Sequence, residues 1–124
     1  MDHWLMIGAS ALSLFGAFFH GGPGARIYLG NINASTLEPL GKSLSAVSWH
    51  IFTIYLTVSG ATFLAVAFDL ASASAAWPLI AANALGAALF LGLSLRGHKA
   101  LLRLPGIYLM GITALCGALA LSDG

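Results

Sequence analysis

The sequence predicts an all-α integral membrane protein, a four-helix up-down bundle with its N- and C-termini outside. Three observations lead to this prediction. The chain of 124 residues is 59% hydrophobic and 7% charged, whereas a soluble domain carries about 25% charged residues. Its mean hydropathy is +0.92, so in water it would expose large apolar patches and aggregate. Finally, the apolar residues gather into four stretches separated by short polar segments.

The first two spans are predicted at about residues 4–19 and 44–68. The first is expected to end at the segment 20–24, His-Gly-Gly-Pro-Gly, because glycine and proline together stop helices. The second helix can begin before its span, because the segment 35–38, Ser-Thr-Leu-Glu, fits a capping box. Pro39 suits the first turn of such a helix, where its missing N–H is not needed.

The last two spans are predicted at about residues 77–95 and 105–121. Trp77 suits a membrane interface, and Pro78 and Pro105 suit helix starts. Each stretch is close to the ~20 apolar residues that cross a hydrocarbon core of ~30 Å. The 124 residues therefore form a single transmembrane domain, with loops at 20–43 and 96–104.

The basic residues predict the orientation of the chain. All five fall in these two loops, and the opposite face carries three acids. Lys and Arg in short loops stay on the cytoplasmic side, so both loops are predicted to be cytoplasmic, in a bacterial inner membrane. The basic residues are Arg26, Lys42, Arg96, Lys99 and Arg103, and the acids are Asp2, Asp69 and Asp123.

Small residues recur at four-residue spacing in every predicted span. In lipid, helices associate largely through close backbone approach across such residues. The pattern leaves two interpretations open, packing within the chain and contact with a partner chain. Asn83, inside the third span, is expected to make an interhelical hydrogen bond. The small-residue sets are Ala9, Ser13 and Ala17; Thr57, Ala61 and Ala65; Ala84, Ala88 and Gly92; and Ala114 and Ala118.

Three of the four histidines are predicted at the cytoplasmic face. His20 ends the first span, His50 lies near the start of the second, and His98 lies in the second loop. His50, Thr53 and Thr57 have the spacing i, i+3, i+7, which places them on one helix face. An ionisable group inside a span is a functional hypothesis by default.

Two roles for this histidine pair stay open. Beside Trp49, His50 can anchor its helix at the headgroup level, as amphipathic rings do. With His20, it can instead ligate haem b or hydrogen-bond a quinone. No structural zinc signature supports a metal site, since zinc needs three or four ligands at fixed spacing.

The sequence carries no motif of an enzyme active site. It has no Gly-x-Ser-x-Gly, phosphate-binding or dinucleotide-binding pattern, its four acids are scattered, and Cys116 is its single cysteine. Five dispersed basic residues form no nucleic-acid footprint. Arg26 can contact lipid phosphate or simply set the topology. These observations favour a non-enzymatic role.

Two short motifs resemble a family of small four-span bacterial inner-membrane proteins. The motifs are His20-x-x-x-Gly24-x-Arg26 and Trp49-His50-x-x-Thr53. The resemblance implies the four-span topology and draws attention to these residues, but it implies no reaction. The family's pattern has Glu before the arginine, and this chain has Ala25 there, so any ion pair of that acid is missing.

The functional hypothesis is a membrane protein that acts through helix–helix contacts, as a homo-oligomer or an accessory subunit of a membrane complex. The alternative is a redox module in which His20 and His50 bind haem or quinone. A conduit is least favoured, because no charged ring lines a path. The wider candidate face comprises Gly24, Arg26, Trp49, Thr53, Thr57 and His98.

Overall fold

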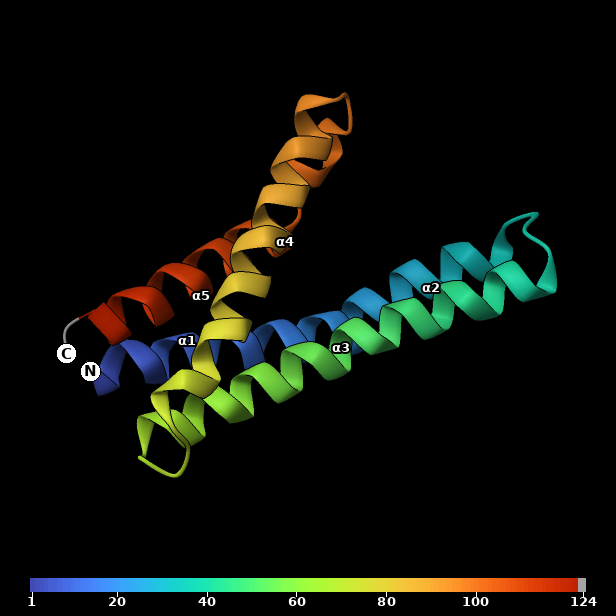
Figure 1. Cartoon of the computed structure of the whole chain (residues 1–124). Helices are drawn as coiled ribbons and strands as arrows, with labels where there is room; N and C mark the ends of the chain where they lie inside the picture. The colour runs from blue at the N-terminus through green and yellow to red at the C-terminus, as the bar shows by residue number, and fades with distance from the viewer. Residues whose placement is uncertain (123–124) are drawn as a thin grey trace.

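The computed structural model describes residues 1–122, and within that range the regular secondary structure consists of helices joined by short turns, with no strand (Figure 1). Four helical segments among these residues are long and apolar enough to cross a membrane, which agrees with the predicted number of spans. They cover His3–Ala34, Pro39–Ala67, Ala73–Leu95 and Pro105–Ser122. The prediction of an all-α membrane bundle is confirmed at this level.

The first helix is twice as long as predicted. It comprises α1 (His3–Phe19), the π-helical turn η1 (His20–Gly24) and α2 (Ala25–Ala34) in direct succession. The prediction that the helix ends at Phe19 is therefore wrong. Pro23 lacks an N–H and its ring would clash with the carbonyl four residues earlier. The wider π turn accommodates that ring without breaking the helix.

The chain then turns at residues 35–38, so the predicted loop of residues 20–43 shrinks to this short connection. The predicted capping box does not form. Ser35 ends α2, its hydroxyl donating to the Ile32 carbonyl at 2.6 Å, and Glu38 makes no side-chain capping bond. The next helix, α3 (Pro39–Ala67), begins at Pro39, as the proline predicted.

Helix α3 runs back alongside α1. Ser10 Oγ donates to the Gly60 carbonyl at 2.8 Å, and His3 Nδ1 lies 2.6 Å from the Ala67 carbonyl. The predicted small-residue set of this helix, Ala9, Ser13 and Ala17, is buried within α1's contacts with the other helices. On α3 the buried face is instead formed by Ser59, Gly60 and Phe63, and Thr57 and Ala61 are exposed.

The second half of the chain forms another arm. The 3-10 turn η2 (Ala73–Ala76) leads into α4 (Trp77–Leu95), and η3 (Lys99–Arg103) leads into α5 (Pro105–Ser122). Helix α5 packs on both α4 and α1. The start of α1 lies beside the end of α5, with Asp2 N–H bonded to the Ala120 carbonyl at 2.9 Å (Figure 1).

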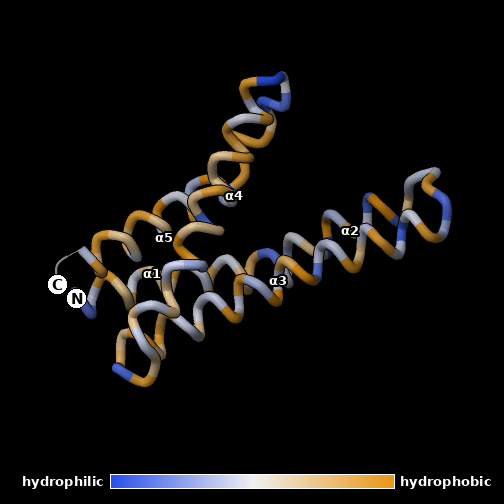
Figure 2. Tube along the Cα trace, in the orientation of Figure 1, coloured by the Kyte–Doolittle hydropathy of each residue, from blue (hydrophilic) through white to orange (hydrophobic). Residues whose placement is uncertain are grey.

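The four spans share one core only at the end of the bundle that holds the termini. This core contains Met6 of α1, Phe63 and Val66 of α3, Ile80 of α4 and Ala114 of α5. Away from it, the α4–α5 arm diverges from the α2–α3 arm (Figure 1). Figure 2 shows hydrophilic residues gathered at the tips of both arms. The bundle is therefore closed at one end and open at the other.

Candidate functional site

The π turn places His20 against α3. His20 Nδ1 and Thr53 Oγ1 lie 2.8 Å apart in a hydrogen bond, and Trp49 Nε1 donates to the His20 carbonyl at 2.9 Å. The imidazole stacks on the Trp49 indole, with ring centroids 3.8 Å apart and planes 12° apart. His20 is thus held by a hydrogen bond of its side chain, by stacking of its ring and by a hydrogen bond to its backbone carbonyl. We call His20, Trp49 and Thr53 the His20 cluster.

Further aromatic rings extend the His20 cluster in two directions. The ring of Tyr28, from α2, also stacks on the Trp49 indole, with ring centroids 4.2 Å apart. Phe52 meets the imidazole edge-on at 5.0 Å, and Tyr55 follows at 5.7 Å from Phe52. Aromatic pairs at these separations add about 0.5–1.5 kcal/mol each beyond the burial of their area. The stacking therefore stiffens the contact between the first helix and α3 around His20.

Two glycines of the π turn allow this close approach. A Cβ on Gly21 would lie 2.7 Å from Thr53 Cγ2. A Cβ on Gly24 would lie 3.0 Å from the Phe19 carbonyl oxygen and 3.4 Å from Trp49 Cζ2. Residues 20–24, which were expected to stop the helix, instead form its contact with α3. Gly24 belongs to the site because a side chain at this position would collide with its neighbours.

The other predicted site residues make no hydrogen bond or ring contact with the side chains of the His20 cluster. Arg26 and His50 are exposed. Thr57 is also exposed, and its hydroxyl donates to the Thr53 carbonyl at 2.9 Å. His98 lies at the tip of the other arm, beyond α4 (Figure 1). Of the predicted set, the structure thus brings His20, Gly24, Trp49 and Thr53 into contact. It also places the exposed His50 close enough to His20 for an electrostatic interaction between the two rings.

An open cleft lies next to the His20 cluster, where the two arms diverge. Its volume is about 540 Å³, and Phe52 of its wall contacts the His20 ring. Ser48 and Tyr55 are its polar lining residues, and behind the wall the buried Asn83 donates from Nδ2 to Tyr55 OH at 3.0 Å. This bond from α4 to α3 confirms the interhelical hydrogen bond expected of Asn83. The lining residues include Ile51, Phe52, Tyr55, Ala82, Gly86 and Met110.

The site and the cleft offer hydrogen-bonding groups and apolar surface. Within residues 1–122, no three His, Cys, Asp or Glu residues gather as a metal site. In the His20 imidazole, Nδ1 is hydrogen-bonded to Thr53 and one ring face is stacked on Trp49. Nε2 is left for another partner. The cleft offers aromatic and aliphatic surface with the hydroxyl groups of Ser48 and Tyr55 in its wall.

Sequence reasoning missed Phe52, Tyr55, Gly86 and Met110. Phe52 and Tyr55 follow the predicted Trp49 at i+3 and i+6 on α3, so the spacing of these aromatic residues could have indicated them. Gly86 and Met110 carried no such signal, because they meet only through the packing of α4 on α5. Their contribution to the cleft depends on how far the two arms diverge.

No family model, curated protein or solved structure matches this chain. The resemblance to small four-span membrane proteins, based on His20, Arg26, Trp49 and His50, stays a prediction.

Proposed function

We propose that this protein is a non-enzymatic membrane component that acts by binding another membrane-spanning helix, as a homo-oligomer or an accessory subunit. The supporting observation is the incomplete burial of α4. Only 17% of the most apolar stretch of Ala73–Leu95 is buried, against 33% for each of the first two spans. The open cleft beside α4 adds a concave apolar surface that one more helix can cover.

The composition of the cleft fits a helix as its occupant. Ala82 on the α4 side is small, and small residues permit close backbone approach in lipid, whereas the space over Gly86 is already filled by the side chain of Met110. Tyr55 and Asn83 supply one polar pair near the base. Such a pair can exchange its internal bond for a bond to a partner helix at little net cost, because each interhelical hydrogen bond in a membrane is worth only about 0.6 kcal/mol on average.

The proposal includes an orientation in a bacterial inner membrane. The chain crosses alternately, with the termini outside and the tips of both arms in the cytoplasm. At about 1.5 Å per residue, the 32-residue first helix is about 48 Å long, against a core of ~30 Å. If α1 starts at the outer interface, His20 lies about 26 Å along it, near the inner interface, and α2 extends beyond the hydrocarbon.

The test is the mass of the protein released gently from its native membrane. A complex heavier than one 12.8 kDa chain is expected, either a multiple of that mass or a stable heteromer. A strict monomer that co-purifies with no other protein would refute the proposal.

Site-specific cross-linking locates the contact. Cys116 is first replaced by serine, and single cysteines are placed at Ile51 in the cleft and at Ala11, an exposed position on α1. Cross-linking to a partner is expected for I51C and not for the matched control A11C. Equal cross-linking at both positions would place the partner elsewhere than the cleft.

A second candidate function is a quinone- or haem-binding redox module. The cleft volume lies within the range of about 300–1,000 Å³ typical of small-molecule sites. Phe52 connects the cleft to the His20 cluster, so a flat ring held there would lie near the imidazole. A Soret band in the absorption spectrum, or quinone in an organic extract of the purified protein, would support this function. The absence of both after expression with ample haem would exclude it.

A further inference from the structure

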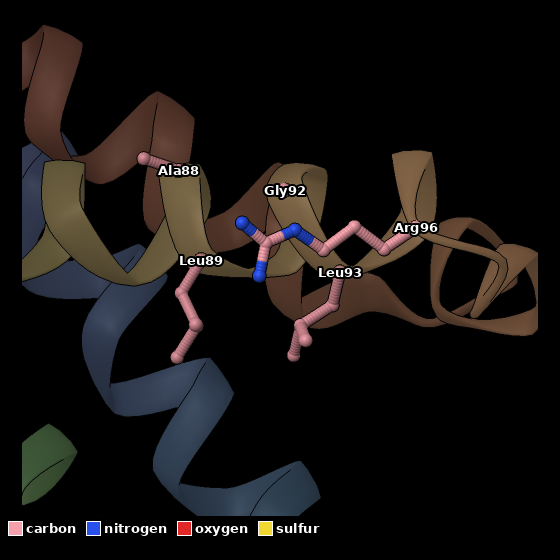
Figure 3. A pocket seen from close by; sticks show the side chains of 5 residues that line it. All are labelled: Ala88, Leu89, Gly92, Leu93 and Arg96. Carbon is pink, nitrogen blue, oxygen red and sulfur yellow. The ribbon is translucent and has the colours of Figure 1, made fainter.

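A second hollow lies on α4, outside the His20 cluster. It has a volume of about 250 Å³ and is lined by Ala88, Leu89, Gly92, Leu93 and Arg96 (Figure 3). Ala88 and Gly92 are its smallest lining residues, and a Cβ on Gly92 would meet nothing within 4 Å. This space is therefore uncovered by any described part of the chain. We call it the Arg96 groove.

The end of α4 directs Arg96 into this groove. His98 N–H bonds to the Leu93 carbonyl at 3.1 Å and Gly97 N–H to the Ser94 carbonyl at 3.3 Å, which together form a Schellman motif. Gly97 has a φ of 113°, as the motif requires. The side chain of Arg96 turns back along α4, and its guanidinium lies over the hollow (Figure 3).

The guanidinium of Arg96 has no counter-ion in its own arm. The sequence contains no Asp or Glu between Trp77 and Ser122. Within the described residues, the hydrogen bonds of Arg96 are those of its backbone N–H. A charged group directed toward the hydrocarbon is costly unless it is paired. From Trp77 to Arg96 the helix rises about 29 Å, so Arg96 reaches the opposite interface, where lipid phosphates lie.

We propose that the Arg96 groove binds one anionic phospholipid, with the guanidinium on the headgroup phosphate and an acyl chain against Ala88 and Gly92. Arginine matches a phosphate with two parallel hydrogen bonds. Lys99 and Arg103 are exposed in the adjoining turn and add positive charge around the headgroup. That charge selects an anionic lipid over one whose headgroup also carries a cation. This site is independent of the helix contact proposed above.

The test measures lipid retained by the full-length protein in detergent micelles, by native mass spectrometry with added phosphatidylglycerol or phosphatidylcholine. Wild-type protein is expected to retain one phosphatidylglycerol. R96Q is expected to bind it about tenfold more weakly, because it loses the charged hydrogen bonds. G92L fills the hollow and should weaken binding similarly. Control variants are R26Q, which removes a cation from the other arm, and G8L, which changes another glycine with open space around it.

Each alternative outcome overturns the proposal. Unchanged binding by R96Q and G92L would show that the groove is not the site. Equal loss in R26Q would indicate attraction by overall charge, and equal retention of phosphatidylcholine would remove the selectivity. Full competition by inorganic phosphate would show a phosphate site without a lipid. A lower oligomer mass for R96Q would assign the guanidinium to a partner chain, whereas the lipid site predicts an unchanged mass. Circular dichroism verifies that each variant is folded.

Discussion

Gly60 lies where α3 presses most closely on α1, and replacing it with alanine tests the packing of the first arm. A Cβ at this position would lie 2.5 Å from Leu14 Cγ and 3.3 Å from the Leu14 backbone nitrogen. The branch point and the backbone cannot swing aside as the end of a flexible side chain could. The two helices must therefore separate locally, which also disturbs the bond from Ser10 to the Gly60 carbonyl.

The expected cost follows from three contributions. Overpacking of a close-packed interface costs about 1–3 kcal/mol, and an interhelical hydrogen bond in a membrane is worth about 0.6 kcal/mol. Alanine in place of glycine favours the helix by about 1 kcal/mol. G60A should therefore lower the free energy of unfolding by about 0.6–2.6 kcal/mol.

The matched control is G8A in α1, where a Cβ would meet nothing within 4 Å. Only the helix-propensity contribution applies there, so G8A should leave the free energy of unfolding unchanged or raise it by up to about 1 kcal/mol. Both variants are compared with wild type by titration with sodium dodecyl sulfate in mixed micelles, followed by tryptophan fluorescence and circular dichroism. If G60A proves as stable as G8A, the close contact inferred between α1 and α3 is wrong.

Three further predictions concern the π turn, the second arm and the orientation. G21A should destabilise the protein by about 1–3 kcal/mol, because its Cβ meets the Thr53 methyl group, whereas G22A, with open space, should not; equal unfolding free energies would contradict this. G97A should cost about 1–2 kcal/mol in the same assay, because its backbone has the positive φ that disfavours alanine, and a neutral effect would argue against the Schellman motif. A periplasm-dependent reporter fused to the C-terminus should be active, and activity of a cytoplasm-dependent reporter alone would invert the proposed orientation.

Sequence features predicted the structure correctly where the outcome depends on composition or on residues close together in the chain. Composition alone required a lipid environment, since a chain with 7% charged residues has too little polar surface to cover it. Pro39, Pro78 and Pro105 lie in the first turns of their helices as predicted, because a missing N–H costs nothing there. The bond of Asn83 was also foreseen, because a buried amide in lipid must find a partner.

The same kind of signal failed at residues 20–24 for a physical reason. Glycine and proline lower the stability of an isolated helix, but in lipid every backbone group must be satisfied within the protein. Continuing through a π turn meets that requirement with a small change of register. The glycines then serve the approach of α3, a role visible only when Thr53 and Trp49 are beside them.

The sequence by itself determined the solvent, the number of spanning helices and most of their starts, because burial of apolar surface and helix capping depend on neighbours along the chain. Tertiary structure alone decided which side chains meet. It placed His20 on Thr53 and Trp49, left His50 exposed, opened the cleft between α3 and α4, and turned Arg96 over its groove. These outcomes depend on helix rotation and on the divergence of the two arms, which are set by packing between residues far apart in the chain.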